Sequence, residues 1–177
     1  MMVSSRISIE FATKVYLIIL GFVALWCLLI LLAPFLLSLG GFAADISFFM
    51  YSLFSPVCHQ EEARSFSIFG HMMGVCSRCS ILYLGFLVGT VIYPFIKKVT
   101  NVKLPSVWYL VIASGLMVGD VALDLMDVYK NNFVTRSITG ATLGFVLAFY
   151  IIPGMINFIY EIYSFIKFKP VVPVKNE

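Results

Sequence analysis

Three of the four cysteines and both histidines fall within one short stretch of the chain, residues 55–79. Cys58 stands alone, whereas Cys76 and Cys79 form a Cys-x-x-Cys pair. Thiolates and imidazoles at such spacings are the side chains that zinc prefers in proteins. A Cys-x-x-Cys pair at the start of a helix also suits a thiol redox centre, because that position favours the thiolate. The stretch therefore predicts a site and leaves two chemistries open.

A structural zinc ion usually takes four ligands, and the cysteines supply three of them. His71 is the better fourth ligand, because His59 directly follows Cys58 and two adjacent residues rarely reach one ion. His59 would then be free to act as a base or a hydrogen-bond partner. The expected metal is zinc, with iron as the alternative. The expected metal ligands are Cys58, Cys76, Cys79 and His71.

A second group of ionisable residues lies inside a later apolar segment. Asp120, Asp124 and Asp127 recur at i, i+4 and i+7, so they share one face of a helix. Asp120 lies past the middle of that segment. An ionisable residue inside a membrane is costly to bury and therefore indicates a function.

The composition of the chain shows the environment in which these residues act. Of its 177 residues 61% are hydrophobic and 12% charged, and the mean hydropathy is +1.00. A soluble domain carries about 25% charged residues. We therefore predict an all-α integral membrane protein with a single membrane domain, residues 1–177, that crosses the cell membrane several times. The basic residues form no patch with aromatic or polar readers, so we expect the lipid bilayer as a partner and no nucleic acid.

Four apolar segments are long enough to cross a bilayer, which takes about 20 helical residues. The stretch from 42 to 54 is shorter and contains Asp45, so it predicts an interfacial or re-entrant helix between the first two spans. The expected fold is a four-transmembrane-helix bundle with a site loop at 55–79. The expected spans are residues 15–39, 77–98, 106–126 and 137–160. Glycines four residues apart in the last three spans, which predict close helix packing, are Gly85/Gly89, Gly115/Gly119 and Gly140/Gly144.

The alternation of spans brings the polar groups together. The second span starts, the third ends and the fourth starts on one side of the membrane, so the site loop and the aspartates meet there. Lysine and arginine are more frequent on the other side, which predicts that both termini are cytoplasmic and the site extracytoplasmic. The eight inner positive charges are Arg6, Lys14, Lys97, Lys98, Lys103, Lys167, Lys169 and Lys175, and the four outer ones are Arg64, Arg78, Lys130 and Arg136.

The carboxylates, imidazole and guanidinium groups at that end are the candidates for catalysis and binding. We expect Asp120 and His59 as proton acceptors and Arg136 as the third catalytic residue. Arginine suits the bidentate recognition of phosphate or carboxylate, so the expected ligand is a lipid phosphate, or a quinone for a redox centre. The candidates for holding that ligand are Arg64, Arg78, Asp124 and Asn132.

These residues resemble an uncharacterised family of small bacterial and archaeal predicted membrane proteins, described as a domain of unknown function. Its Cys-His-Gln … Cys-x-Arg-Cys signature is similar to Cys58-His59-Gln60, Arg64-Ser65-Phe66, Gly70 and Cys76-Ser77-Arg78-Cys79, followed by Tyr83, Gly85 and Gly89. A later part of the resemblance consists of Asp120, Asn132, Arg136, Thr139 and Gly140. The chain departs from the pattern at Val121 and Asp124, where Gly and Gln are expected. The resemblance implies membership and no activity.

Three functions remain open from the sequence, and a purely structural or partner-binding role also remains if Asp120 merely pairs with Arg136. The first is a metal site, either structural or part of a metal-dependent enzyme acting on a membrane-associated substrate. The second is a thiol-disulfide oxidoreductase that uses Cys76 and Cys79 with Cys58. Its plan resembles the vitamin K epoxide reductase family, which implies electron transfer from thiols to a quinone, but the loop has one cysteine where that family has a pair. The third is a metal-ion transporter subunit with Asp120 and Asp124 as a cation path. Four short spans without an inverted repeat make a poor monomeric carrier, an objection that a homo-oligomer would avoid.

Overall fold

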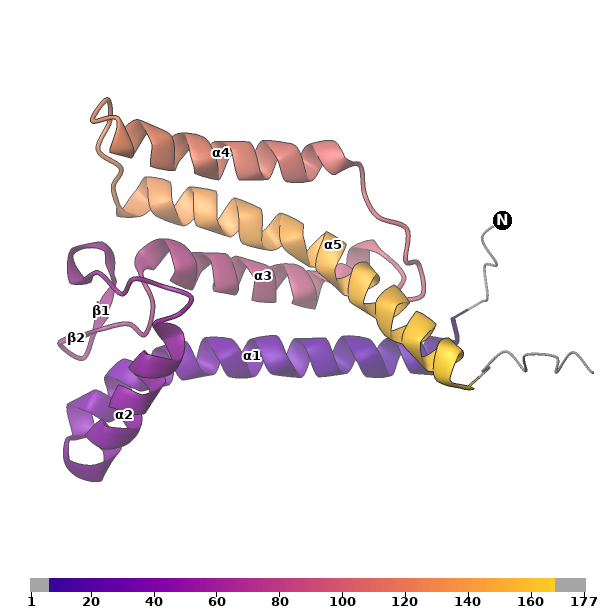
Figure 1. Ribbon diagram of the computed structural model, residues 1–177, viewed down its shortest axis with the longest axis horizontal. Helices are drawn as coiled ribbons and strands as arrows, with labels where there is room; N and C mark the ends of the chain where they lie inside the picture. The colour runs from indigo at the N-terminus through magenta and orange to yellow at the C-terminus, as the bar shows by residue number, and fades with distance from the viewer. Residues whose placement is uncertain (1–6, 168–177) are drawn as a thin grey trace, which may run out of the picture.

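The computed structural model describes residues 7–167, and it is mostly helical (Figure 1). A 3-10 turn, η1, and a two-stranded antiparallel hairpin lie between the second and third helices. Three of the lysines and arginines counted above, Arg6, Lys169 and Lys175, lie outside the described residues. In chain order the elements are α1 (Ile9–Leu39), α2 (Gly41–Phe54), η1 (Glu62–Arg64), β1 (Ser67–Ile68), β2 (His71–Met72), α3 (Ser77–Ile96), α4 (Val107–Leu125) and α5 (Phe133–Lys167).

Four of the helices, α1, α3, α4 and α5, are long and apolar enough to cross a membrane. The shorter α2 lies between the first two of them and folds back against α1, where the Ser47 hydroxyl donates to the Ala33 carbonyl at 2.7 Å. This arrangement confirms the expected all-α bundle of four long apolar helices, with a shorter helix between spans 1 and 2.

The helix ends differ from the expected ones where side chains cap them. α1 begins at Ile9, before residue 15, because the Ser8 hydroxyl accepts a hydrogen bond from the Phe11 amide at 3.3 Å. α5 begins at Phe133, before residue 137, because the Asn132 side chain accepts from the second and third amides of the helix. It also continues past residue 160 to Lys167. Hydropathy marks the apolar part of a helix and misses the polar turns that extend it.

The closest pair of helices is α3 and α5, which meet backbone to backbone through glycines. A Cβ added to Gly85 would lie 2.6 Å from the Ala141 carbonyl oxygen, and one added to Gly140 would lie 2.7 Å from the Arg78 carbonyl oxygen. Small residues allow such contact in lipid, where no hydrophobic force pulls helices together. The glycine pair Gly115/Gly119 in α4 has nothing within 4 Å of its added Cβ positions. Two of the three glycine pairs therefore pack helices together within the described chain.

The start of α1 and the end of α5 lie at one end of the bundle (Figure 1). The start of α3, the end of α4, the start of α5 and the hairpin lie together at the left of the figure, beside α2. One buried cluster, which includes Tyr16, Tyr93 and Ile152, joins α1, α3 and α5 near the opposite end. A second cluster, around Ile30 and Phe54, lies under the hairpin. The two clusters fix α1 against the close pair α3 and α5.

The glycine contacts generate a stability prediction. Gly144→Ala places a methyl group against the Leu82 carbonyl and should destabilise the protein by about 1–3 kcal/mol, the usual cost of overpacking. Gly115→Ala, the matched control, faces open space and should leave stability unchanged or raise it by up to about 1 kcal/mol, because alanine is the better helix former. Denaturant unfolding of both variants in detergent measures the difference. Equal effects would show that the α3–α5 contact does not limit stability.

Candidate metal centre

Three cysteine sulfurs form a cluster at the start of α3. The Sγ atoms of Cys58, Cys76 and Cys79 all lie within 4.8 Å of one another, and all three thiols are free. Cys58 is buried, and the other two are half-buried. Two thiolates on one tetrahedral zinc ion, with bonds of about 2.3 Å, lie roughly 3.8 Å apart. The three sulfurs can therefore meet on one ion after small shifts.

The backbone around the cluster directs donors at one of these sulfurs. The Cys58 sulfur accepts hydrogen bonds from the backbone N–H of Cys76, at 3.2 Å, and of Gln60, at 3.5 Å. Cys76 is the N-cap residue of α3, and Cys79 lies in the first turn of that helix. Backbone N–H groups and the positive end of a helix dipole both stabilise thiolates. The local fold thus directs two backbone donors at the Cys58 sulfur and places Cys76 and Cys79 at the start of a helix.

Gln60 holds this arrangement together, although the sequence assigned it no role. Its side-chain amide donates to the backbone carbonyls of Tyr51 and Gly74, both at 2.8 Å. One carbonyl belongs to α2 and the other to the segment that leads into Cys76, so Gln60 closes the loop that carries Cys58. Its backbone has a φ of 51°, a left-handed conformation that turns the chain here. The sequence signals for this role are its place two residues after Cys58 and its part in the Cys-His-Gln signature.

Hydrogen bonds within the cluster lower the pKa of Cys76. A hydrogen bond from the Cys79 thiol lowers the pKa of Cys76, and it outweighs burial, which acts in the opposite direction. Backbone N–H groups of Cys79 and Arg78 and the thiol of Cys58 add to the lowering. The thiolate is the species that coordinates metals and that attacks disulfides. The cluster is therefore equipped for either chemistry.

Aromatic side chains enclose the cluster on the side of α1. Trp26 lies edge-on against Phe54, with ring centroids 5.1 Å apart, and against Tyr83, at 5.9 Å. Tyr83 and both half-buried cysteines pack on the same buried cluster as Phe54 and Cys58. An apolar wall of this kind excludes water and strengthens electrostatic interactions beside it.

The two histidines are placed differently from the sulfurs. His71 is half-buried on β2, where it pairs with Ile68 of β1. His59 follows Cys58 and is exposed. Among the described residues, the group of potential ligands within 4.8 Å of one another contains neither imidazole. The role of His71 as a fourth ligand stays a prediction.

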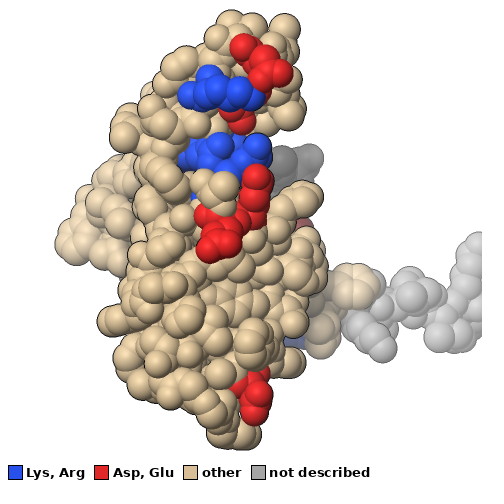
Figure 2. Space-filling view, turned by 90° about the vertical axis from the view of Figure 1, so that its left-hand side faces the viewer, with Lys and Arg blue, Asp and Glu red and all other residues tan. Residues whose placement is uncertain are grey.

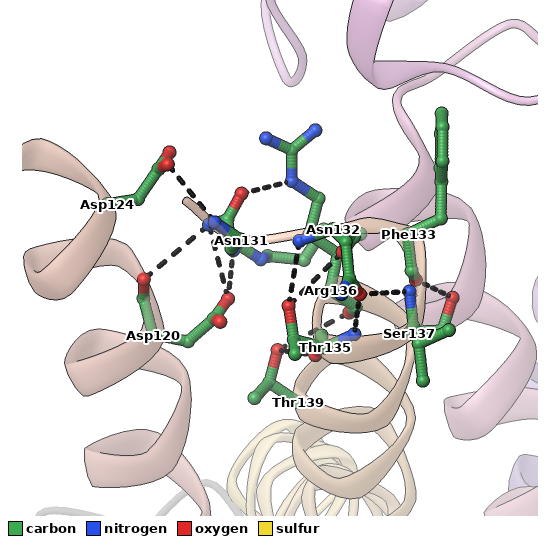
Figure 3. A network of polar contacts seen from close by, with 11 residues as sticks. Asp120, Asp124, Asn131, Asn132, Phe133, Thr135, Arg136, Ser137 and Thr139 are labelled. Atoms are coloured by element: carbon green, nitrogen blue, oxygen red, sulfur yellow. Dashed lines mark hydrogen bonds and ion pairs between the residues drawn. The ribbon is translucent and has the colours of Figure 1, made fainter. Parts of the chain in front are cut away.

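Beside the cysteines, a chain of polar contacts joins three helices. Arg78, which lies between Cys76 and Cys79, forms an ion pair with Asp120, and their side chains are 16% and 9% exposed. The Asn131 amide donates to the Asp120 carboxylate at 3.4 Å, and its oxygen accepts from the Arg136 Nε at 2.6 Å (Figure 3). The contacts therefore run from α3 through α4 to α5. They engage both Asp120 and Arg136, which the sequence proposed as catalytic.

The remaining candidates for ligand binding have structural partners in this state. Arg64 is exposed and pairs with Glu61 at 3.0 Å. The Asp124 carboxylate accepts a hydrogen bond from the backbone N–H of Asn131 at 3.2 Å, and the Asn132 side chain caps α5. Charged side chains gather in the upper half of this end of the molecule (Figure 2). The structure thus pairs Asp120 with Arg78, which lies between two of the cysteines in the sequence, and places Arg64 on the surface.

The buried ion pair generates a prediction about stability. Asp120→Ala leaves the Arg78 guanidinium buried without its partner, which typically costs about 3–5 kcal/mol. Replacing both residues, Asp120→Ala with Arg78→Met, should recover most of that loss because no buried charge remains. Asp127→Ala removes an exposed ion pair with Lys130 and should have little effect. Chemical unfolding in detergent of wild type, these three variants and the Arg78→Met single variant checks this. If the loss of stability in the double variant equals the sum of the losses in the two single variants, direct pairing is contradicted.

Comparison with known proteins relates this arrangement to a family. Residues 58–150 match the family described as "Predicted membrane protein (DUF2085)". An uncharacterized protein of Methanocaldococcus jannaschii is 44% identical over 151 residues, which cover 84% of this chain and 97% of that protein. An uncharacterized protein of Methanothermobacter thermautotrophicus is 33% identical over 95 residues, covering 54% and 84%. No solved structure matches the chain. The match includes all three clustered cysteines, and the chain belongs to the DUF2085 family of predicted membrane proteins.

Proposed function

We propose that this protein is a membrane metalloprotein in which Cys58, Cys76 and Cys79 hold a zinc ion. The observation that carries the proposal is the placement of three sulfurs within 4.8 Å of one another at the start of an apolar helix. Zinc is favoured over iron, because iron–sulfur clusters usually take four cysteines and this group has three. The backbone N–H groups aimed at Cys58 fit a bound thiolate.

The number of sulfurs favours a zinc ion with a free position. Structural zinc sites are closed by four protein ligands, whereas catalytic sites have three and hold water or substrate at the fourth position. Zinc bound in this way would supply a Lewis acid and an activated water. His59 is exposed beside Cys58 and is the better proton acceptor, since Asp120 is engaged by Arg78. A fourth bond from His71 would instead make the site structural.

The cations near the cluster suggest the class of substrate. Arg78 lies within the Cys-x-x-Cys pair, and Arg136 uses its Nε toward Asn131. Its terminal guanidinium nitrogens point away from these contacts and have no hydrogen-bond partner among the described residues (Figure 3). Guanidinium groups bind phosphate and carboxylate in bidentate fashion. These features support a membrane-associated substrate with such a group, for which a lipid phosphate is our proposal.

The distribution of charge supports an extracytoplasmic position for the site. Within the described chain, Lys14, Lys97, Lys98, Lys103 and Lys167 lie toward the end where α1 begins and α5 ends (Figure 1). At the cysteine end, two of the four basic residues belong to the polar network just described. An excess of lysine and arginine marks the cytoplasmic side. The proposal therefore places both termini in the cytoplasm of a multi-pass cell-membrane protein.

A thiol-disulfide oxidoreductase is the second candidate, because the Cys79 thiol hydrogen-bonds to Cys76 with Cys58 in reach of both. In this reaction the Cys76 thiolate and the Cys79 thiol form a disulfide and release two electrons and one proton. A quinone would accept both electrons, take up that proton and one from solvent, and become a quinol. A metal-ion transporter has less support, since Arg78 neutralises Asp120 and the Asp124 carboxylate accepts an amide N–H.

Metal analysis tests the proposal. Protein purified in detergent should contain about one zinc ion per chain, as expected for a single thiolate site. Cys58→Ser, Cys76→Ser and Cys79→Ser should each lose it, because two sulfurs bind zinc far more weakly than three. Cys27→Ser is the matched control: Cys27 is buried on α1, outside the cluster, and its removal should leave the zinc content unchanged.

X-ray absorption at the zinc edge then counts the sulfur ligands and detects imidazole. Loss of a nitrogen signal in His71→Ala would indicate a closed structural site, whereas an unchanged spectrum would indicate an open one. Protein without metal in which Cys76 and Cys79 change between thiol and disulfide under mild reductant would refute the zinc site and favour the oxidoreductase.

A further inference from the structure

A second site lies at the opposite end of the bundle from the cysteines. A cavity of about 490 Å³ opens between the end of α3, the α3–α4 connection, the start of α4 and the middle of α5. Figure 1 shows α5 running away from α4 and toward the start of α1 at this end. The cavity lies where α4 and α5 diverge. Its size is in the range of small-molecule sites, about 300–1,000 Å³.

The walls of the cavity are mainly apolar and aromatic. Tyr109 of α4 lines it, and so do Phe145, Val146 and Phe149 of α5. The hydroxyl of a further lining residue, Tyr150, donates to the Ser106 carbonyl at 2.6 Å and so ties α5 to the start of α4. The hydrogen bond occupies the polar group of that side chain. The walls are therefore suited to a hydrocarbon chain and offer little to a polar solute.

One cation lies in the lining of this apolar space. Lys97, the residue after α3, is the only charged residue among those that line the cavity. Its ammonium donates to the Lys103 carbonyl and has two further N–H donors. Partial burial lowers the pKa of Lys97, a penalty that a bound anion would offset. Lys98 and Lys103 add positive charge, and the sequence has no Asp or Glu between Glu62 and Asp120.

We propose that the cavity binds an anionic phospholipid, with a hydrocarbon chain between α4 and α5 and the phosphate at Lys97. Basic pockets between transmembrane helices are typical sites for anionic head groups. The ligand would also fill a gap in the packing of α4, of which only Ala113 is buried. This site is separate from the cysteine cluster and does not depend on the proposed zinc.

Native mass spectrometry of the full chain in detergent tests the proposal, with phosphatidylglycerol and phosphatidylcholine of identical chains as probes. The wild-type protein should retain phosphatidylglycerol in preference. Lys97→Gln should reduce that preference about fivefold, the effect of losing one lysine contact of about 1 kcal/mol. Lys98→Gln is the matched control, because Lys98 is exposed and lies outside the lining, so it should lower the preference less than Lys97→Gln does.

A second variant tests the hydrocarbon chain. Val146→Trp fills the cavity and should abolish retention of both lipids, whereas Val118→Trp, on an exposed face of α4, should not. Thermal unfolding with and without phosphatidylglycerol gives an independent readout, because a bound lipid stabilises the folded protein. Equal retention of the two lipids by wild type, equal losses for the two glutamine variants, or undiminished binding by Val146→Trp would each overturn the proposal.

Discussion

The close contact between α3 and α5 is the constraint on which the other parts of the structure depend. In lipid no hydrophobic force drives helices together, so two helices stay in place only where their backbones fit. The Arg78 carbonyl lies against Gly140, which means that α5 fixes the first turn of α3. That turn contains Cys79 and follows Cys76. A contact made by glycines therefore sets the position of the thiols.

The first turn of α3 also contains Arg78, whose charge needs a partner. Arg78 is largely buried, and a buried guanidinium without a counter-ion would be costly. Asp120 supplies the charge from α4, and Asn131 connects that carboxylate to Arg136 on α5. Three spans are thus joined at the end where the cysteines lie. The ion pair leaves neither Arg78 nor Asp120 as an uncompensated buried charge.

The bundle separates two kinds of surface. At one end the backbone turns, donors converge on Cys58, and aromatic rings from α1 and α2 close the cluster. At the other end α4 and α5 diverge, and the space between them is apolar apart from Lys97. The rigid pair α3 and α5 runs through both regions. An occupied cavity would support the most weakly packed span without changing the geometry of the cysteine cluster.

Hydropathy and the alternation of spans were enough to predict the four long helices, the shorter helix between the first two, and the shared end of the polar residues. These properties are local or follow from counting crossings. The partners of individual side chains depend on how each helix rotates and where each loop runs. Only the tertiary structure showed that Asp120 pairs with Arg78, that Gln60 closes the cysteine loop, and that the three cysteine sulfurs meet. Spacing along the chain brings candidate ligands near one another, and the backbone path decides which of them meet.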